Sequence, residues 1–172
     1  MHKKIPNKFY FINSFKKNNM DKLDNYTAVI YRNYKDRFNL KEIIKIKEYC
    51  KKKRIRFYIS NSYKIALKLG LDGAYIPSFN KNFGHLNFCT KPSFSILGSA
   101  HNLKEIRIKE KQGVKFIFIS SVFKKNKNYL GTYRFRILKN LTRIKVVALG
   151  GFSKTNKKKI NLLKCSGFSG IS

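Results

Sequence analysis

Two adjacent glycines, Gly150 and Gly151, follow a continuous apolar run near the end of the sequence, and a segment of helical character comes next. Glycine has no Cβ, so a glycine pair lets the backbone approach a bound group closely. The start of a helix directs backbone N–H groups toward such a group, and phosphate is the usual occupant. The same pattern also occurs in a tight turn between a strand and a helix. The glycine pair is therefore a candidate phosphate site whose meaning depends on the surrounding elements.

Apolar, β-branched or aromatic runs recur at regular intervals and predict eight strands. They cover residues 8–13, 27–32, 55–60, 73–77, 93–98, 115–120, 145–150 and 167–172. Several are too continuously apolar to have a solvated face, and segments of helical period lie between most of them. This alternation predicts a parallel sheet in an α/β fold, either doubly wound or closed, and eight units favour a compact (β/α)8 TIM barrel. We expect residues 1–172 to form a single domain, with no helical period in the connection 78–93 and with the last helix of the barrel lacking or replaced.

Capping residues mark where the predicted helices begin. The predicted caps are, in chain order, Asn39, Asn61 or Ser62, Asn102 and Ser153. In the helix that follows Asn39, the spacing places Leu40, Ile43, Ile44 and Cys50 toward one side.

The active site of such a barrel lies at the carboxyl ends of the strands, and phosphate is often held by the loops after the seventh and eighth strands. Gly150, Gly151 and the segment that ends at Ser172 occupy those two places. The glycine pair thus stands where a phosphate-binding barrel needs it.

Several strand-end motifs, taken together, resemble the thiamine phosphate synthase/TenI family over essentially the whole chain. The motifs are AVIYRNY, YISNSYKIALKLGLDGAYIP, ILGSAHNLKEI, FIFISSVFKKNKNYLGTYRF and VVALGGFSKTN, in the order in which the family has them. Each motif alone is weak, but five in the right order are fairly specific.

The resemblance implies an enzyme that joins hydroxymethylpyrimidine diphosphate to thiazole phosphate and releases pyrophosphate, so its partners would be these two small ligands. It implies that Arg32 and Ser99 contact the pyrophosphate as catalytic residues, and that the backbone of Gly150 and Gly151 holds the thiazole phosphate. The planar fork of an arginine suits this role because it can bind two phosphate oxygens at once. Ser120, at the end of the sixth strand, is counted with the phosphate-binding residues.

The metal site implied by the family is not evident. Family members bring Mg2+ to the pyrophosphate with an Asn-Asp pair after the third strand and an Asp after the fourth. Here the first pair reads Ser60-Asn61, and residues 76–90 contain no carboxylate. Mg2+ usually takes one or two carboxylates together with substrate phosphates. We therefore expect no metal ligands of the usual kind. Asn61 is a candidate polar residue there, and Mg2+ is kept as an alternative.

An alternative is a TenI-like protein that binds a thiazole or thiamine phosphate without synthase activity, or that acts as a tautomerase. Members with tautomerase activity place a His directly before Val-Phe, where this chain has Ser121. A hydroxyl without a partner is a poor general base. His101 is a further candidate, read either as catalytic or as a packing residue at a helix start. Asp36 is the carboxylate to test as a general acid.

The loop after the sixth strand carries Lys124, Lys125 and Lys127. Lys125 and Lys127 are candidates for neutralising a pyrophosphate that lacks its metal. A solvated basic loop is the competing interpretation.

The formal net charge is +31, with 39 Lys and Arg against eight Asp and Glu. Such a surface is expected to bind nucleic acid nonspecifically at low salt, and a nucleic-acid-binding protein is a further alternative, favoured by Tyr and Phe interleaved with Lys and Arg in 123–139. Against it, lysines are spread over nearly every polar segment, and the aromatics of 123–139 fall at positions that a barrel core would use.

The cysteines and the lengths of the apolar stretches indicate where in the cell the protein is expected. Three scattered cysteines suggest neither a disulfide framework nor a zinc site. No apolar stretch is long enough to cross a bilayer and no cleavable leader is evident, so a cytoplasmic location without membrane partners is expected. An open barrel flank would expose apolar surface, which suggests a homodimer.

Overall fold

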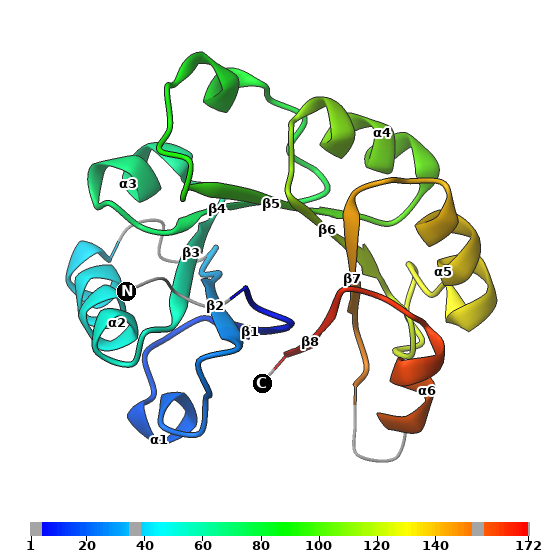
Figure 1. The fold of residues 1–172 in the computed structure, drawn as a ribbon, viewed down its shortest axis with the longest axis horizontal. Coiled ribbons are helices and arrows are strands. Elements are labelled where there is room, and N and C mark those ends of the chain that lie inside the picture. Colours follow the sequence, from blue (N-terminus) through cyan, green and yellow to red (C-terminus); the bar gives the residue numbers. More distant parts are fainter. Residues whose placement is uncertain (1–4, 35–38, 153–156, 172) are drawn as a thin grey trace.

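Eight parallel strands form a closed barrel in the order in which they occur along the chain (Figure 1). The structure is a computed structural model that describes residues 5–34, 39–152 and 157–171. The strands are β1 (Lys8–Ile12), β2 (Thr27–Tyr31), β3 (Arg56–Ser60), β4 (Gly73–Ile76), β5 (Ser95–Ala100), β6 (Phe116–Ser120), β7 (Lys145–Leu149) and β8 (Gly167–Ile171). Pairing of β1 with β8, in register from Lys8 opposite Phe168, closes the barrel. The predicted (β/α)8 fold is confirmed, and each predicted strand overlaps an observed one.

Helices cover the outside of the barrel in Figure 1. They are α1 (Lys17–Met20), α2 (Leu40–Lys52), α3 (Tyr63–Lys68), α4 (Leu103–Lys111), α5 (Gly131–Asn140) and α6 (Lys157–Leu162), and the 3₁₀ turn η1 (Gly84–Asn87) lies in the connection between β4 and β5. The sequence predicts no helix in this connection, and the structure has only this short 3₁₀ turn there. Among the described residues, no helix combines the length and the apolar character needed to cross a bilayer.

Capping residues predict two of the helix starts correctly. The Asn39 side chain accepts a hydrogen bond from the backbone N–H of Glu42, and Asn102 does the same for Glu105. Ser62 occupies the cap position of α3, but its side chain makes no capping hydrogen bond. The predicted cap Ser153 lies outside the described residues.

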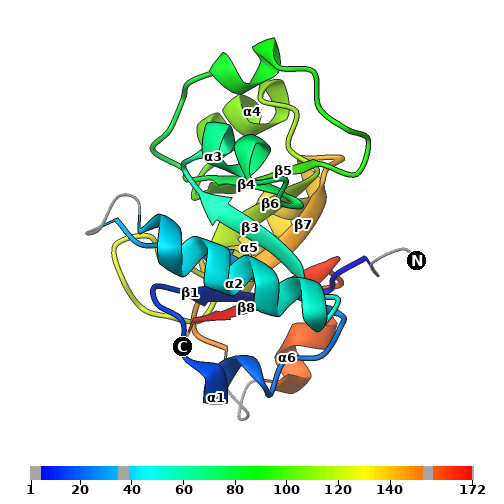
Figure 2. The ribbon, with the colours of Figure 1, turned by 90° about the vertical axis from the view of Figure 1, so that its left-hand side faces the viewer.

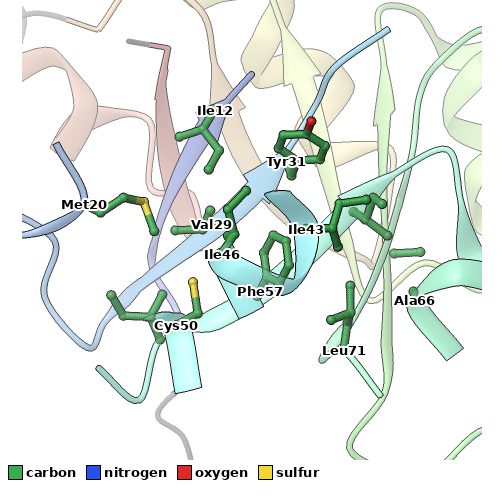
Figure 3. Close-up of a cluster of buried hydrophobic side chains, with 13 residues drawn as sticks. Ile12, Met20, Val29, Tyr31, Ile43, Ile46, Cys50, Phe57, Ala66 and Leu71 are labelled. Carbon is green, nitrogen blue, oxygen red and sulfur yellow. The ribbon is translucent and has the colours of Figure 1, made fainter. Parts of the chain in front are cut away.

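α2 lies on the outside of the barrel in Figure 2, and its buried face, drawn in Figure 3, differs from the predicted one. Ile43, Ile46 and Cys50 are buried, whereas Leu40 and Ile44 are 48% and 44% exposed. Residues 43, 46 and 50 share one face because each residue turns about 100° around a helix, and Ile44 lies one step away from that face. The buried side chains pack against Val29, Phe57 and their neighbours on the outer surface of the strands.

The interior of the barrel is filled mainly by aromatic and branched side chains. This cluster consists of Phe9, Phe11, Ala28, Ile30, Tyr58, Tyr75, Leu97, Phe116, Phe118, Val147 and Leu149. The rings of Phe11, Tyr75 and Phe118 meet edge to face, with centroids 5.2 to 5.9 Å apart. The barrel is therefore a packed core, and a ligand has to bind above it, at the carboxyl ends of the strands, here called the barrel mouth.

Candidate active site

Arg32 follows β2 directly and lies at the barrel mouth. Its guanidinium carbon lies 4.7 Å from the centroid of the Phe11 ring, and its backbone N–H donates to the carbonyl of Ile12 at 2.7 Å. A cation stacked on an aromatic face has a defined plane, which suits bidentate binding of an anion. The packed interior thus supports a positive charge at the mouth, where the sequence places the predicted pyrophosphate contact.

Ser99 and Tyr75 lie beside Arg32. Burial raises the pKa of the Tyr75 hydroxyl, although a hydrogen bond with Ser99 and the positive charge of Arg32 act in the opposite direction. Tyr75 therefore remains a neutral phenol at physiological pH. The structure brings Arg32 and Ser99 together through this tyrosine, which the sequence interpretation treated only as part of a strand.

Three serines lie at or next to the carboxyl ends of strands, on the inner face of the barrel. Side chains alternate along a strand, so Ser60, Ser99 and Ser120 continue the inward-facing positions two residues beyond Tyr58, Leu97 and Phe118. The Ser60 hydroxyl lies 3.2 Å from the hydroxyl of Tyr34, and Ser99 and Ser120 are buried. The mouth is thus lined with hydroxyl groups of the kind that bind phosphate oxygens.

His101 is fixed between the start of α4 and the end of β6. Its Nδ1 lies 2.8 Å from the backbone carbonyl of Ser120, and its Nε2 is 3.5 Å from the Asn128 amide nitrogen. A carbonyl oxygen only accepts, so Nδ1 carries the proton. The Ser120 hydroxyl, 3.1 Å from the same nitrogen, consequently cannot pass its proton to His101. In this arrangement His101 positions Ser120 and does not activate it.

Asn61 is held at the end of β3 with a φ angle of 57°. Its side-chain oxygen accepts a hydrogen bond from the Asn80 amide at 2.6 Å. The carbonyl of Asn80 in turn accepts from the ammonium of Lys109 at 2.7 Å and from Gln112 at 3.2 Å. This chain of contacts connects the mouth to α4 through the connection between β4 and β5.

Lys109 was not identified from the sequence, although a signal was present. It stands three residues after the buried Ile106 in a helix, and it is itself fully buried. A lysine at a core position of a helix indicates a specific polar partner. Burial lowers the pKa of Lys109 to about 8.

Gly150 and Gly151 have φ angles of 101° and 79° and lie against the loop that follows β6. A Cβ on Gly150 would lie 2.7 Å from the Ser121 hydroxyl oxygen, and a Cβ on Gly151 would overlap the backbone nitrogen of Lys124. The space that these glycines leave is therefore taken by the neighbouring loop. Phosphate binding by their backbone remains a prediction, and the cap of the following helix lies outside the described residues.

The loop after β6 contains the remaining predicted residues. Ser121 donates its hydroxyl to the carbonyl of Lys124 at 2.8 Å, so its side chain has a structural role. Lys124, Lys125 and Lys127 are exposed. The backbone of Lys124 lies against Gly151, so this basic loop adjoins the glycine pair.

The described donors at the mouth do not fit a carboxylate-held Mg2+. The side-chain oxygens described above belong to serines, asparagines and tyrosines, whereas Mg2+ in proteins usually takes one or two carboxylates. A carboxylate nearby is Glu105, which accepts a hydrogen bond from the backbone N–H of His101 at 2.7 Å. Among the residues that the structure describes, no group of three or more His, Cys, Asp or Glu could hold a metal ion. Asp36 lies outside the described residues.

Taken together, the chain is a closed (β/α)8 barrel with an arginine, buried hydroxyls and a glycine pair at the carboxyl ends of its strands. The family model described as thiamine monophosphate synthase matches residues 20–172. The chain belongs to this family.

Curated relatives and solved structures agree with this assignment. The chain is 31% identical over 133 residues to the thiamine-phosphate synthase of Caldanaerobacter subterraneus, and 32% identical over 140 residues to that of Prochlorococcus marinus subsp. pastoris. These alignments cover 75% and 79% of this chain but only 61% and 39% of the relatives, so the chain spans part of their length. Thiamine phosphate pyrophosphorylase from Pyrococcus furiosus superposes with a TM-score of 0.79 at 19% identity, over 99% of this chain and 87% of that one. The structure from Pyrococcus supports the fold.

Proposed function

We propose that this protein is a thiamine phosphate synthase that joins hydroxymethylpyrimidine diphosphate to thiazole phosphate and releases pyrophosphate. The observation that carries the proposal is Arg32, stacked on Phe11 beside Tyr75 and Ser99 in a chain of this family. The leaving diphosphate gains negative charge as it departs, and a fixed cation stabilises that charge more in the transition state than in the ground state.

The other mouth residues have supporting roles in this proposal. Ser99 and Ser120 donate hydrogen bonds to phosphate oxygens, and the backbone of Gly150 and Gly151 holds the thiazole phosphate. Lys125 and Lys127 supply the positive charge that a metal ion supplies where carboxylates are present. No step requires a proton transfer by His101.

A second candidate is a protein that binds the thiazole phosphate without turnover. It is favoured by the described donor set, which lacks the metal-holding carboxylates. Tautomerisation is less well supported, because the Ser121 hydroxyl is engaged with the carbonyl of Lys124.

Turnover with both substrates tests the proposal. Thiamine phosphate is measured by fluorescence after oxidation, with and without Mg2+, for the unchanged protein, Arg32→Ala and the control Arg143→Ala, which removes an exposed arginine from the loop before β7. We expect product from the unchanged protein and from Arg143→Ala, and a loss of about 100-fold or more in kcat for Arg32→Ala.

Two other results would separate the alternatives. Calorimetric binding of thiazole phosphate without any product, retained in Arg32→Ala, would support the second candidate. Equal activity of Arg32→Ala and Arg143→Ala would contradict the assigned role of Arg32.

A further inference from the structure

The outer face of α5 carries an exposed apolar stripe. Phe135 is buried against the barrel, whereas Tyr133 is 77% and Ile137 45% exposed. These two residues are four positions apart and lie on the same side of the helix, away from Phe135. The prediction that the aromatics of this segment lie at core positions is correct for Phe135 and wrong for Tyr133.

Two exposed arginines flank this stripe. Each residue of a helix turns about 100°, so Arg134 lies on one side of Tyr133 and Ile137, and Arg136 lies on the other. An exposed tyrosine ring with an arginine on each side offers a flat apolar face and positive charges within one helical turn.

A hollow of about 380 Å³ adjoins the stripe between α5, α6 and the loop after β6. Its polar lining includes Tyr129, Arg136 and Lys159, and its apolar lining includes Val122 and Leu163. Tyr129 is 44% exposed. The two helices are adjacent in Figure 1, and the Lys139 ammonium of α5 donates to the carbonyl of Leu163 at 3.2 Å. The hollow and the stripe therefore form one continuous surface, here called the α5 surface.

The charge of this part of the chain is of one sign. After Glu110 the sequence has no aspartate or glutamate, while lysines and arginines continue as far as Lys164. Glu110 itself accepts hydrogen bonds from Arg107 and from Thr142, each at 2.7 Å. Thr142 follows the C-terminal end of α5. Positive charge on the α5 surface is thus not offset by acids of residues 111–172.

We propose that the α5 surface binds a single-stranded nucleic acid, with bases stacked on Tyr133 and Tyr129 and with phosphates held by Arg134, Arg136 and Lys159. Aromatic rings alternating with basic side chains match a strand in which bases alternate with phosphates. A duplex buries its base faces, so it would use the charges but not the exposed rings. The proposal is independent of the reaction at the barrel mouth.

Fluorescence anisotropy with a labelled twelve-residue oligouridine at about 150 mM NaCl tests this proposal. Tyr133→Ala is expected to weaken binding about tenfold, and Tyr133→Phe, which keeps the stacking ring, to bind as the unchanged protein does. Arg134→Gln combined with Arg136→Gln is expected to weaken binding about tenfold and to reduce the salt dependence by roughly the contribution of two phosphates.

Matched controls distinguish a site from net charge. Lys51→Gln with Lys52→Gln removes the same charge from exposed positions of α2, and Phe83→Ala removes an aromatic ring that is 41% exposed. Both controls are expected to stay within about twofold of the unchanged protein. Thermal unfolding of each variant verifies that it is folded.

Several results would overturn the proposal. These are an equal loss in the α2 and α5 charge variants, a duplex that binds as tightly as the oligouridine, or no binding of the oligouridine by the unchanged protein. Binding to vesicles containing phosphatidylserine that depends on Tyr133, without binding of the oligouridine, would assign the surface to a membrane instead.

Discussion

At the residue scale, the glycine pair after β7 has two separable roles. Its missing Cβ atoms make room for the loop after β6, since Cβ atoms there would meet Ser121 and Lys124. Its backbone N–H groups are the part that the family resemblance assigns to phosphate. Packing against the loop therefore explains why glycine stands at both positions, while phosphate binding requires its own test.

Gly151→Ala is expected to destabilise the protein by about 3 kcal/mol or more, because a side chain would combine a left-handed φ of 79° with overlap of the Lys124 backbone. Gly70→Ala is the matched control, since Gly70 has a φ of 59° with no atom within 4 Å of an added Cβ. It is expected to cost about 1 to 2 kcal/mol. Urea unfolding measures both, and equal costs would show that the loop yields to the added methyl group.

At the element scale, the connection between β4 and β5 is stabilised by side chains of α4 in place of a helix of its own. Backbone carbonyls need partners. The Asn80 and Asn82 carbonyls accept from Gln112, and Asn80 also accepts from Lys109. The hydrocarbon chain of Lys109 packs over Gly98, where a Cβ would lie 2.9 Å from its Cδ. Through Asn80, this network also fixes Asn61 at the mouth.

The free energy of unfolding is expected to rise with pH above about 8 because of Lys109. Burial lowers the pKa of Lys109 from 10.5 to about 8, so between these values the unfolded chain binds more protons than the folded one, and folding gains stability as pH increases. Above pH about 10 the trend is opposed by buried Tyr58, whose pKa is raised to about 12 by burial. Urea unfolding between pH about 7.5 and 9.5 should show a gain of about 1 to 2 kcal/mol. In Lys109→Met the free energy of unfolding should change little over this pH range. The same increase with pH as in the unchanged protein would show that Lys109 is not its cause.

Helix caps offer a second test at this scale. Asn102→Ala removes the side-chain oxygen that accepts from Glu105 at 2.9 Å and is expected to cost about 1 kcal/mol of stability. Ser62→Ala, at a cap position without a side-chain hydrogen bond, should cost less than half of that. Thermal or urea unfolding compares the two, and a larger loss for Ser62→Ala would show that its hydroxyl has a role other than capping.

At the scale of the whole molecule, patterns among neighbouring residues predict the fold, whereas the site also depends on contacts between residues far apart in the sequence. The regular spacing of apolar runs predicts the barrel, and Asn39 and Asn102 predict helix starts, because these are properties of neighbouring residues. The contact of Gly151 with the loop at Lys124 joins segments far apart in sequence, as does that of Asn80 with Lys109. Neither contact leaves a periodic signal. The prediction that the aromatics of 123–139 lie at core positions is wrong for Tyr133, which lies on the side of α5 away from the buried Phe135.

The net charge of +31 already includes the eight acidic residues, and six of these acids accept hydrogen bonds within the part of the chain that the structure describes. They are Asp21, Asp24, Glu42, Asp72, Glu105 and Glu110.

The remaining positive charges repel one another, and salt screens this repulsion. The free energy of unfolding is therefore expected to rise by roughly 1 to 2 kcal/mol between about 20 and 500 mM NaCl, because the compact state holds the charges closer together than the unfolded chain does. Pyrophosphate at constant ionic strength should add a further, saturable stabilisation if it binds the folded protein at the mouth. That addition should disappear in Arg32→Ala and persist in Arg143→Ala, which lose the same charge. An equal effect of sulfate, retained in Arg32→Ala, would mean that anions act on the surface as a whole and that the mouth has no preference for a diphosphate.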